Sequence, residues 1–252
     1  MSETEFLARG PGARLAYNRL EGPKGAPGVV FLHGLMSDRG GTKAMALEGH
    51  CRAKGYNFVR FDMSGHGASS GRFEDGTLSR WTEDACAVLD ALTTGPQILV
   101  GSSMGGWVML RTARARSDKV SGLVGIAAAP DFTEEICAQL SPAQRSEMER
   151  SGIVHVQSDY DERPYPISHG LITDGRACCL LGAPVDIRVP VRLLQGQRDT
   201  SVAWQTPLKI ADALTSEDVD VLLVKDGDHR LSRPQDLAKL TAAIDELVQV
   251  TA

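Results

Sequence analysis

Residues 101–106 (GSSMGG) constrain the fold of this chain more than any other part of its sequence. They directly follow the short apolar run 97–100, which is typical of a buried strand, and a helical pattern spans 107–116. Centred on Ser103, the stretch reads G-x-S-x-G between a strand and a helix. Glycines on either side of the serine remove side chains that would clash where the chain reverses. The pattern therefore predicts a nucleophile elbow, a sharp turn that presents the Ser103 hydroxyl in a cleft.

Apolar runs and amphipathic stretches alternate along almost the whole chain. The runs lack clean alternation, which is typical of strands covered on both faces in a parallel sheet. We expect strands at 28–32, 57–61, 97–100, 120–127, 191–194 and 219–224, with an edge strand at 14–18. We expect helices at 43–54, 78–92, 107–116, 204–214 and 235–250. This order predicts an α/β fold: a mostly parallel central sheet with helices on both faces.

The segment 131–186 interrupts this rhythm. It lacks a clear buried strand and carries helical patterns at 132–140, 142–151 and 172–181, with a polar stretch rich in Tyr and Pro at 160–166. Long insertions in compact domains usually have a function. We therefore expect residues 1–130 and 187–252 to form the core, and 131–186 to form a small helical cap within the same domain; a surface excursion without contact to the site is the alternative.

Composition and charge exclude several classes of protein. The 252 residues are 42% hydrophobic and 23% charged, which is ordinary for a globular domain, and a net charge of -5 argues against nucleic acid as a partner. No apolar run is long enough for a transmembrane helix, so we expect no integral membrane association. The acidic start lacks the pattern of a secretion signal or transit peptide. Five scattered cysteines show no zinc-ligand spacing, and we expect a reducing, cytoplasmic location with no metal.

A serine nucleophile needs a base and a carboxylate that orients it. In the α/β-hydrolase arrangement these partners follow the serine in the order acid, then histidine. Asp199 lies just beyond the predicted strand 191–194, and His229 lies just beyond 219–224. Ligands of such sheets bind at the carboxyl ends of the strands, where both residues are expected. We therefore predict Ser103, Asp199 and His229 as the catalytic residues.

Other residues compete for these roles. His66, in a glycine-rich turn, is an alternative base, and Asp131, after the strand 120–127, is an alternative acid. His33 is expected to support the loop after the strand 28–32. The remaining histidines and nearby acids are expected on the surface or in the cap: His50, His155, His169, Asp226 and Asp228.

The oxyanion formed on carbonyl attack needs two backbone N–H donors. Met104, directly after the nucleophile and at the positive end of a helix, is expected to supply one. The loop His33-Gly34-Leu35-Met36 is expected to supply the other. We favour Leu35, although the spacing also fits Met36. Met36 and Trp204 are candidates for lining an acyl pocket, with core packing as the alternative.

Several longer segments resemble one known family: 41–44 (GTKA), 60–65 (RFDMSG), 95–107 (GPQILVGSSMGGW), 218–222 (DVDVL) and 228–230 (DHR). With the HG of 33–34 and the DxxGxGxS of 62–69, the chain resembles serine α/β hydrolases. More narrowly, it resembles the α/β-hydrolase domain-containing protein ten group of mitochondrial acyl-protein thioesterases and acyl-glucuronide esterases. The resemblance implies hydrolysis of acyl thioesters or esters through Ser103, Asp199 and His229. The absence of a transit peptide from the start favours a cytosolic relative.

We therefore expect a serine hydrolase that cleaves carboxylic esters or thioesters, of small molecules or acylated proteins, through an acyl-enzyme. This chemistry requires no organic cofactor. A carbon–carbon hydrolase, a perhydrolase or an acyltransferase could use the same three residues. A hydrolase-fold binding protein without activity would have little use for them in this order. The physiological acyl group and the oligomeric state do not follow from the sequence.

Overall fold

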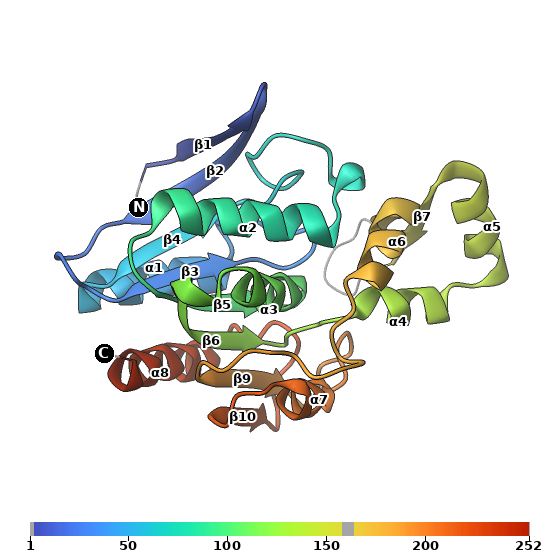
Figure 1. The fold of residues 1–252 in the computed structure, drawn as a ribbon. Coiled ribbons are helices and arrows are strands. Elements are labelled where there is room, and N and C mark those ends of the chain that lie inside the picture. Colours follow the sequence, from blue (N-terminus) through green and yellow to red (C-terminus); the bar gives the residue numbers. More distant parts are fainter. Residues whose placement is uncertain (1–2, 158–163, 252) are drawn as a thin grey trace.

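The computed structural model describes residues 3–157 and 164–251. Its centre is an eight-stranded sheet in the order β1-β2-β4-β3-β5-β6-β9-β10 (Figure 1). β1 and β2 pair antiparallel at one edge, β2 pairs antiparallel with β4, and all other neighbours are parallel. The strands are β1 (Glu5–Gly10), β2 (Ala13–Leu20), β3 (Gly28–Leu32), β4 (Asn57–Phe61), β5 (Gln97–Ser102), β6 (Val120–Ile126), β9 (Val191–Gly196) and β10 (Val219–Val224).

Helices cover both faces of this sheet. α2 packs on α3 over one face, and α1 packs on α8 over the other. Successive side chains of β5 point to opposite faces of the sheet: Leu99 packs in the layer of α2 and α3, and Ile98 and Val100 pack in the layer of α1 and α8. The helices are α1 (Thr42–Lys54), α2 (Leu78–Leu92), α3 (Met104–Ala115), α7 (Thr206–Ala213) and α8 (Pro234–Val250), with short 3-10 turns at Phe73–Asp75 and Ser117–Lys119. The predicted α/β-hydrolase fold is confirmed.

The segment after β6 leaves the sheet and contains both helices and strands (Figure 1). Its elements are α4 (Phe132–Gln139), α5 (Pro142–Ser151), β7 (Ile153–Val156), β8 (Tyr165–Ser168) and α6 (His169–Ala177). The pair β7–β8 corrects the expectation of helices alone; each strand has only four residues, too few for a readable alternation. α6 also begins and ends earlier than predicted. Of the stretch 160–166, residues 160–163 lie outside the described residues.

Asp131, at the start of this segment, binds the backbone near the end of the segment. Its carboxylate oxygens accept hydrogen bonds from the backbone N–H groups of Leu180 at 2.8 Å and Leu181 at 2.9 Å. Asp131 itself has φ 62°, in the left-handed region that aspartate tolerates better than most residues. The two ends of the segment are therefore tied together where it leaves and rejoins the sheet.

Candidate active site

Ser103 occupies the turn between β5 and α3. Its φ of 54° and ψ of -123° lie outside the regions that a residue with a Cβ favours. The turn is crowded, because a Cβ on Gly105 would overlap the carbonyl oxygens of Leu32 and His33. Backbone hydrogen bonds hold the strained residue: Ser103 N–H donates to Ile126 at 3.0 Å, and Ala129 N–H donates to the Ser103 carbonyl at 3.1 Å. The surrounding chain thus fixes the hydroxyl in place.

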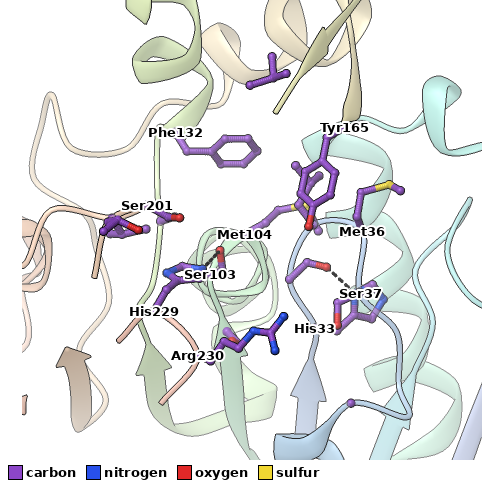
Figure 2. A pocket seen from close by; sticks show the side chains of 18 of the residues that line it. His33, Met36, Ser37, Ser103, Met104, Phe132, Tyr165, Ser201, His229 and Arg230 are labelled. Atoms are coloured by element: carbon purple, nitrogen blue, oxygen red, sulfur yellow. Dashed lines mark hydrogen bonds between the residues drawn. The ribbon is translucent and has the colours of Figure 1, made fainter. Parts of the chain in front are cut away.

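Ser103, His229 and Asp199 form one hydrogen-bonded chain. Nδ1 of His229 lies 2.8 Å from Oδ2 of Asp199, and its Nε2 lies 3.2 Å from Oγ of Ser103 (Figure 2). An ionised carboxylate only accepts, so the imidazole proton belongs on Nδ1 and Nε2 is free to accept from the serine. The three residues follow β5, β9 and β10, whose carboxyl ends meet at one edge of the sheet.

The carboxylate of Asp199 is fully buried, and both of its oxygens accept hydrogen bonds. Its Oδ1 accepts from the N–H groups of Ser201 and Val202, both at 2.8 Å, and its Oδ2 accepts from Nε2 of Gln195 as well as from His229. Burial raises the pKa of Asp199, but the hydrogen bond and charge of His229 and the two backbone donors outweigh it, so the pKa is lowered. Asp199 is thus an ionised partner for His229.

Gln195 is a residue that our sequence reasoning missed. It lies inside β9, four positions before Asp199, and its side chain is fully buried. An amide near the end of a strand predicted to be buried was the available signal, because a buried polar side chain requires a partner.

The buried ring of His33 fixes the orientation of the Gly34–Leu35 peptide in the loop after β3. Nδ1–H of His33 donates to the Gly34 carbonyl at 2.8 Å, while Nε2 accepts from the N–H of Met63 at 3.1 Å. Burial lowers the pKa of His33 to about 4, which keeps the ring neutral for these two roles. In a trans peptide the C=O and N–H point in opposite directions. With the Gly34 carbonyl turned toward His33, the Leu35 N–H points away from that buried ring.

A cavity of about 570 Å³ opens over Ser103 and His229. Figure 2 shows Phe132, Tyr165 and Met36 on one side of Ser103 and Arg230 on the other. Further apolar lining comes from Leu35, Met104, Ile136, Val156 and Ile167. Of the two candidates for an acyl pocket, Met36 lines the cavity. Trp204 is a correction: it is about one-third exposed just before α7 and is not among the described residues that line the cavity.

The alternative acids and bases are engaged elsewhere. His66 is buried edge-on against His33, Phe73 and Trp81, and burial lowers its pKa to about 3. Asp131 accepts hydrogen bonds from the N–H groups of Leu180 and Leu181, as described above. The remaining candidates have other partners or positions: His50 contacts Asp245, His155 contacts Glu147, His169 begins α6, Asp226 pairs with Arg233, and Asp228 accepts from Leu231 N–H.

The described residues contain neither a membrane-spanning helix nor a candidate metal-binding cluster. No helix among them is long and apolar enough to cross a membrane. In the same residues, no group of three or more His, Cys, Asp or Glu side chains is arranged to hold a metal ion.

A mostly parallel sheet with a serine at its strand–helix elbow, bonded to a later histidine, defines the α/β-type serine hydrolases. Residues 23–169 match the family described as serine aminopeptidase, S33. The chain is 42% identical to bovine (Bos taurus) palmitoyl-protein thioesterase ABHD10, mitochondrial, and 41% identical to the human (Homo sapiens) protein, covering 96% of this chain and 79% of each relative. The chain belongs to the ABHD10 family of α/β hydrolases.

Solved structures agree with this assignment. The structure of mouse α/β-hydrolase domain-containing protein 10 matches with a TM-score of 0.90 and 40% identity over 100% of both chains. A putative hydrolase from Agrobacterium vitis S4 matches with a TM-score of 0.92 and 40% identity over 98% of both. The predictions of the family and of a serine hydrolase for esters or thioesters are confirmed.

The comparisons overturn one prediction. The bovine and human relatives are both named as mitochondrial, which contradicts the expected cytoplasmic location. The inference depended on the composition of the first residues and on the cysteines. All five cysteines are free in the structure, but free thiols indicate only a reducing environment, which is not a single compartment.

Proposed function

We propose that this protein is an acyl-thioesterase and acyl-esterase with Ser103 as nucleophile, His229 as base and Asp199 as the group that orients His229. One observation carries the proposal. Oγ of Ser103, the ring of His229 and the carboxylate of Asp199 are linked by contacts of 3.2 Å and 2.8 Å at the floor of a cavity. A serine hydroxyl becomes a nucleophile at neutral pH when such a base accepts its proton.

The reaction proceeds in two transfers. Nε2 of His229 takes the Ser103 proton as Oγ attacks the substrate carbonyl, and the resulting oxyanion collapses as His229 gives that proton to the departing thiolate or alkoxide. His229 then removes a proton from water, whose oxygen attacks the acyl-enzyme. The second collapse releases the carboxylic acid, and the proton returns to Ser103.

Backbone N–H groups of Leu35 and Met104 bind the oxyanion in this proposal. Met104 is the first residue of α3, where N–H groups have no partner within the helix. The orientation of the Gly34–Leu35 peptide supports Leu35 over Met36, because His33 holds the carbonyl of that peptide on the opposite side. The closeness of Gly34 to Ser103 also supports Leu35, since a Cβ on Gly34 would lie 3.3 Å from Cβ of Ser103. Each donor is typically worth about 3 kcal/mol in the transition state.

Segment 131–186 acts as the cap that selects the acyl group. Phe132 and Ile136 from α4 and Tyr165 and Ile167 from β8 all contribute to the cavity lining. Apolar pockets favour ligands by the area that they remove from water, so a long acyl chain gains most from this side. Relatives named as palmitoyl-protein thioesterases support acylated proteins as substrates.

A rate series tests the proposal. Thioesters, acyl-glucuronides and p-nitrophenyl esters of increasing chain length are compared on the wild-type protein and on Ser103→Ala. We expect kcat/KM to rise with chain length, and Ser103→Ala to lose at least about 10³-fold of kcat. Full turnover by Ser103→Ala would refute the mechanism, and a sharp preference for short chains would refute the long-chain specificity.

A further inference from the structure

Lys43 stands in the first turn of α1, where a positive charge faces the positive end of the helix dipole. The helix itself therefore does not favour a lysine at this position. Nζ of Lys43 donates to the backbone carbonyl oxygen of Arg230 at 2.6 Å, and both residues line the cavity above Ser103. The contact joins the segment after β3, which carries Leu35, to the loop after β10, which carries His229.

The acceptor belongs to a peptide group that is held at both ends. Its carbonyl, from Arg230, accepts from Lys43, and its N–H, from Leu231, donates to Oδ1 of Asp228 at 3.0 Å. Leu231 is buried with φ 43°, a strained backbone for a leucine. Such strain persists only where surrounding contacts impose it. These contacts lie within two residues of His229.

We propose that Lys43 is a positioning residue, which holds the loop of His229 through the Arg230 carbonyl and so keeps Nε2 of His229 against Oγ of Ser103. This inference rests on the proposed roles of Ser103 and His229. A displaced imidazole accepts the serine proton poorly, whereas the apolar lining that binds the acyl chain is untouched. The effect of losing Lys43 therefore falls on kcat rather than on KM.

The charge of Lys43 provides a second readout. Burial lowers the pKa of Lys43 to about 8; the charge of Asp228 raises this pKa and the charge of Arg230 lowers it. The other titratable groups near this end of the cavity are Asp38 and His229, which line it together with Lys43. An ammonium donates a stronger hydrogen bond than an amine, so the contact weakens as the pH rises through about 8. The folded state does not lose stability in that range, because there the unfolded chain binds the proton more tightly than the folded one.

The test compares Lys43→Met and Lys43→Arg with the wild-type protein. Lys54→Met is the matched control, because Lys54 ends the same helix in an ion pair with Asp245. On one p-nitrophenyl ester, we expect Lys43→Met to lower kcat on the order of 10-fold with little change in KM. We expect wild-type kcat to decline above pH 8 without a fall in Tm, and Lys43→Arg to restore kcat and abolish the decline. Lys54→Met is expected to match the wild type.

Three outcomes would overturn the inference: an unchanged kcat in Lys43→Met, a change confined to KM, or the same alkaline decline in Lys43→Arg as in the wild type. If Lys43→Met does not fold, the pH profiles of the wild type and Lys43→Arg decide the matter. Failure of the proposed function is separate, since it would appear as turnover by Ser103→Ala.

Discussion

Nε2 of Gln195 and Nδ1 of His229 both bond to one atom, Oδ2 of Asp199, each at 2.8 Å. Gln195 is fully buried, and its Oε1 has no hydrogen-bond partner in the described part of the structure. The orientation of this amide is therefore set by what its nitrogen donates to, including the carboxylate. Gln195 thus helps to hold the carboxylate of Asp199 in place, and that carboxylate in turn holds the ring of His229.

Replacing Gln195 with methionine keeps the volume and removes the donor. We expect kcat to fall on the order of 10-fold with little change in KM, because Asp199 then aligns the His229 ring less well. Losing a donor to the carboxylate also raises the pKa of Asp199 toward its ordinary range, which still leaves it ionised at neutral pH, so we expect kcat to be lower across the whole pH profile. Gln197→Met, on the same loop, is the control. An unchanged profile in Gln195→Met would show that the other donors suffice.

The elbow glycine Gly105 does not tolerate a methyl group. Because a Cβ there would overlap backbone atoms of Leu32 and His33, we expect Gly105→Ala to reduce the free energy of unfolding by about 3 kcal/mol. Gly49, in the exposed interior of α1 with open space around it, gives the matched variant. Gly49→Ala should stabilise the protein by about 0.5–1 kcal/mol. Urea unfolding of both variants measures the difference, and equal shifts would contradict this account.

Asp131 provides a test that separates structure from catalysis. Asparagine keeps the shape and tolerates the left-handed backbone, but presents an N–H group to one of the two donors from Leu180 and Leu181. We expect Asp131→Asn to cost about 1–2 kcal/mol of stability. On a short ester kcat should be nearly unchanged, while kcat/KM for a long-chain ester falls as the cap loosens. A loss of kcat near 10⁴-fold on both esters would instead identify Asp131 as the catalytic acid.

Acid stability depends on two buried histidines. Burial lowers the pKa of His33 to about 4 and of His66 to about 3, from 6.5 in the unfolded chain. Below pH 6.5 the unfolded chain binds more protons, so stability falls as the pH falls. Each histidine contributes about 1.4 kcal/mol per pH unit at most, until its folded pKa is reached. Unfolding measured from pH 7 to pH 4 should show a shallower fall in His66→Leu, with turnover retained; an unchanged slope would contradict the assignment.

Local sequence pattern predicted the core of this fold well, because burial on both faces gives a strand a readable composition. α2 was predicted at its observed bounds, and so were the buried strands β3 and β4; the bounds of β10 were predicted too, although this edge strand is only partly buried. β1 was missed because its residues are almost all exposed, so its sequence has no alternation of buried and exposed positions. Trp204 was misassigned because a large apolar side chain near a site in sequence does not reveal which way its loop turns.

The sequence by itself determined the nucleophile candidate, its two partners and their order, since the G-x-S-x-G turn and two loops after strands are local features. Tertiary structure alone decided which atoms meet. Parallel pairing of β5, β6, β9 and β10 brings Ser103, Asp199 and His229 to one edge, although 126 residues separate the serine from the histidine. The contact of Lys43 with the Arg230 carbonyl depends on side-chain packing between elements far apart in the chain, for which no local pattern exists.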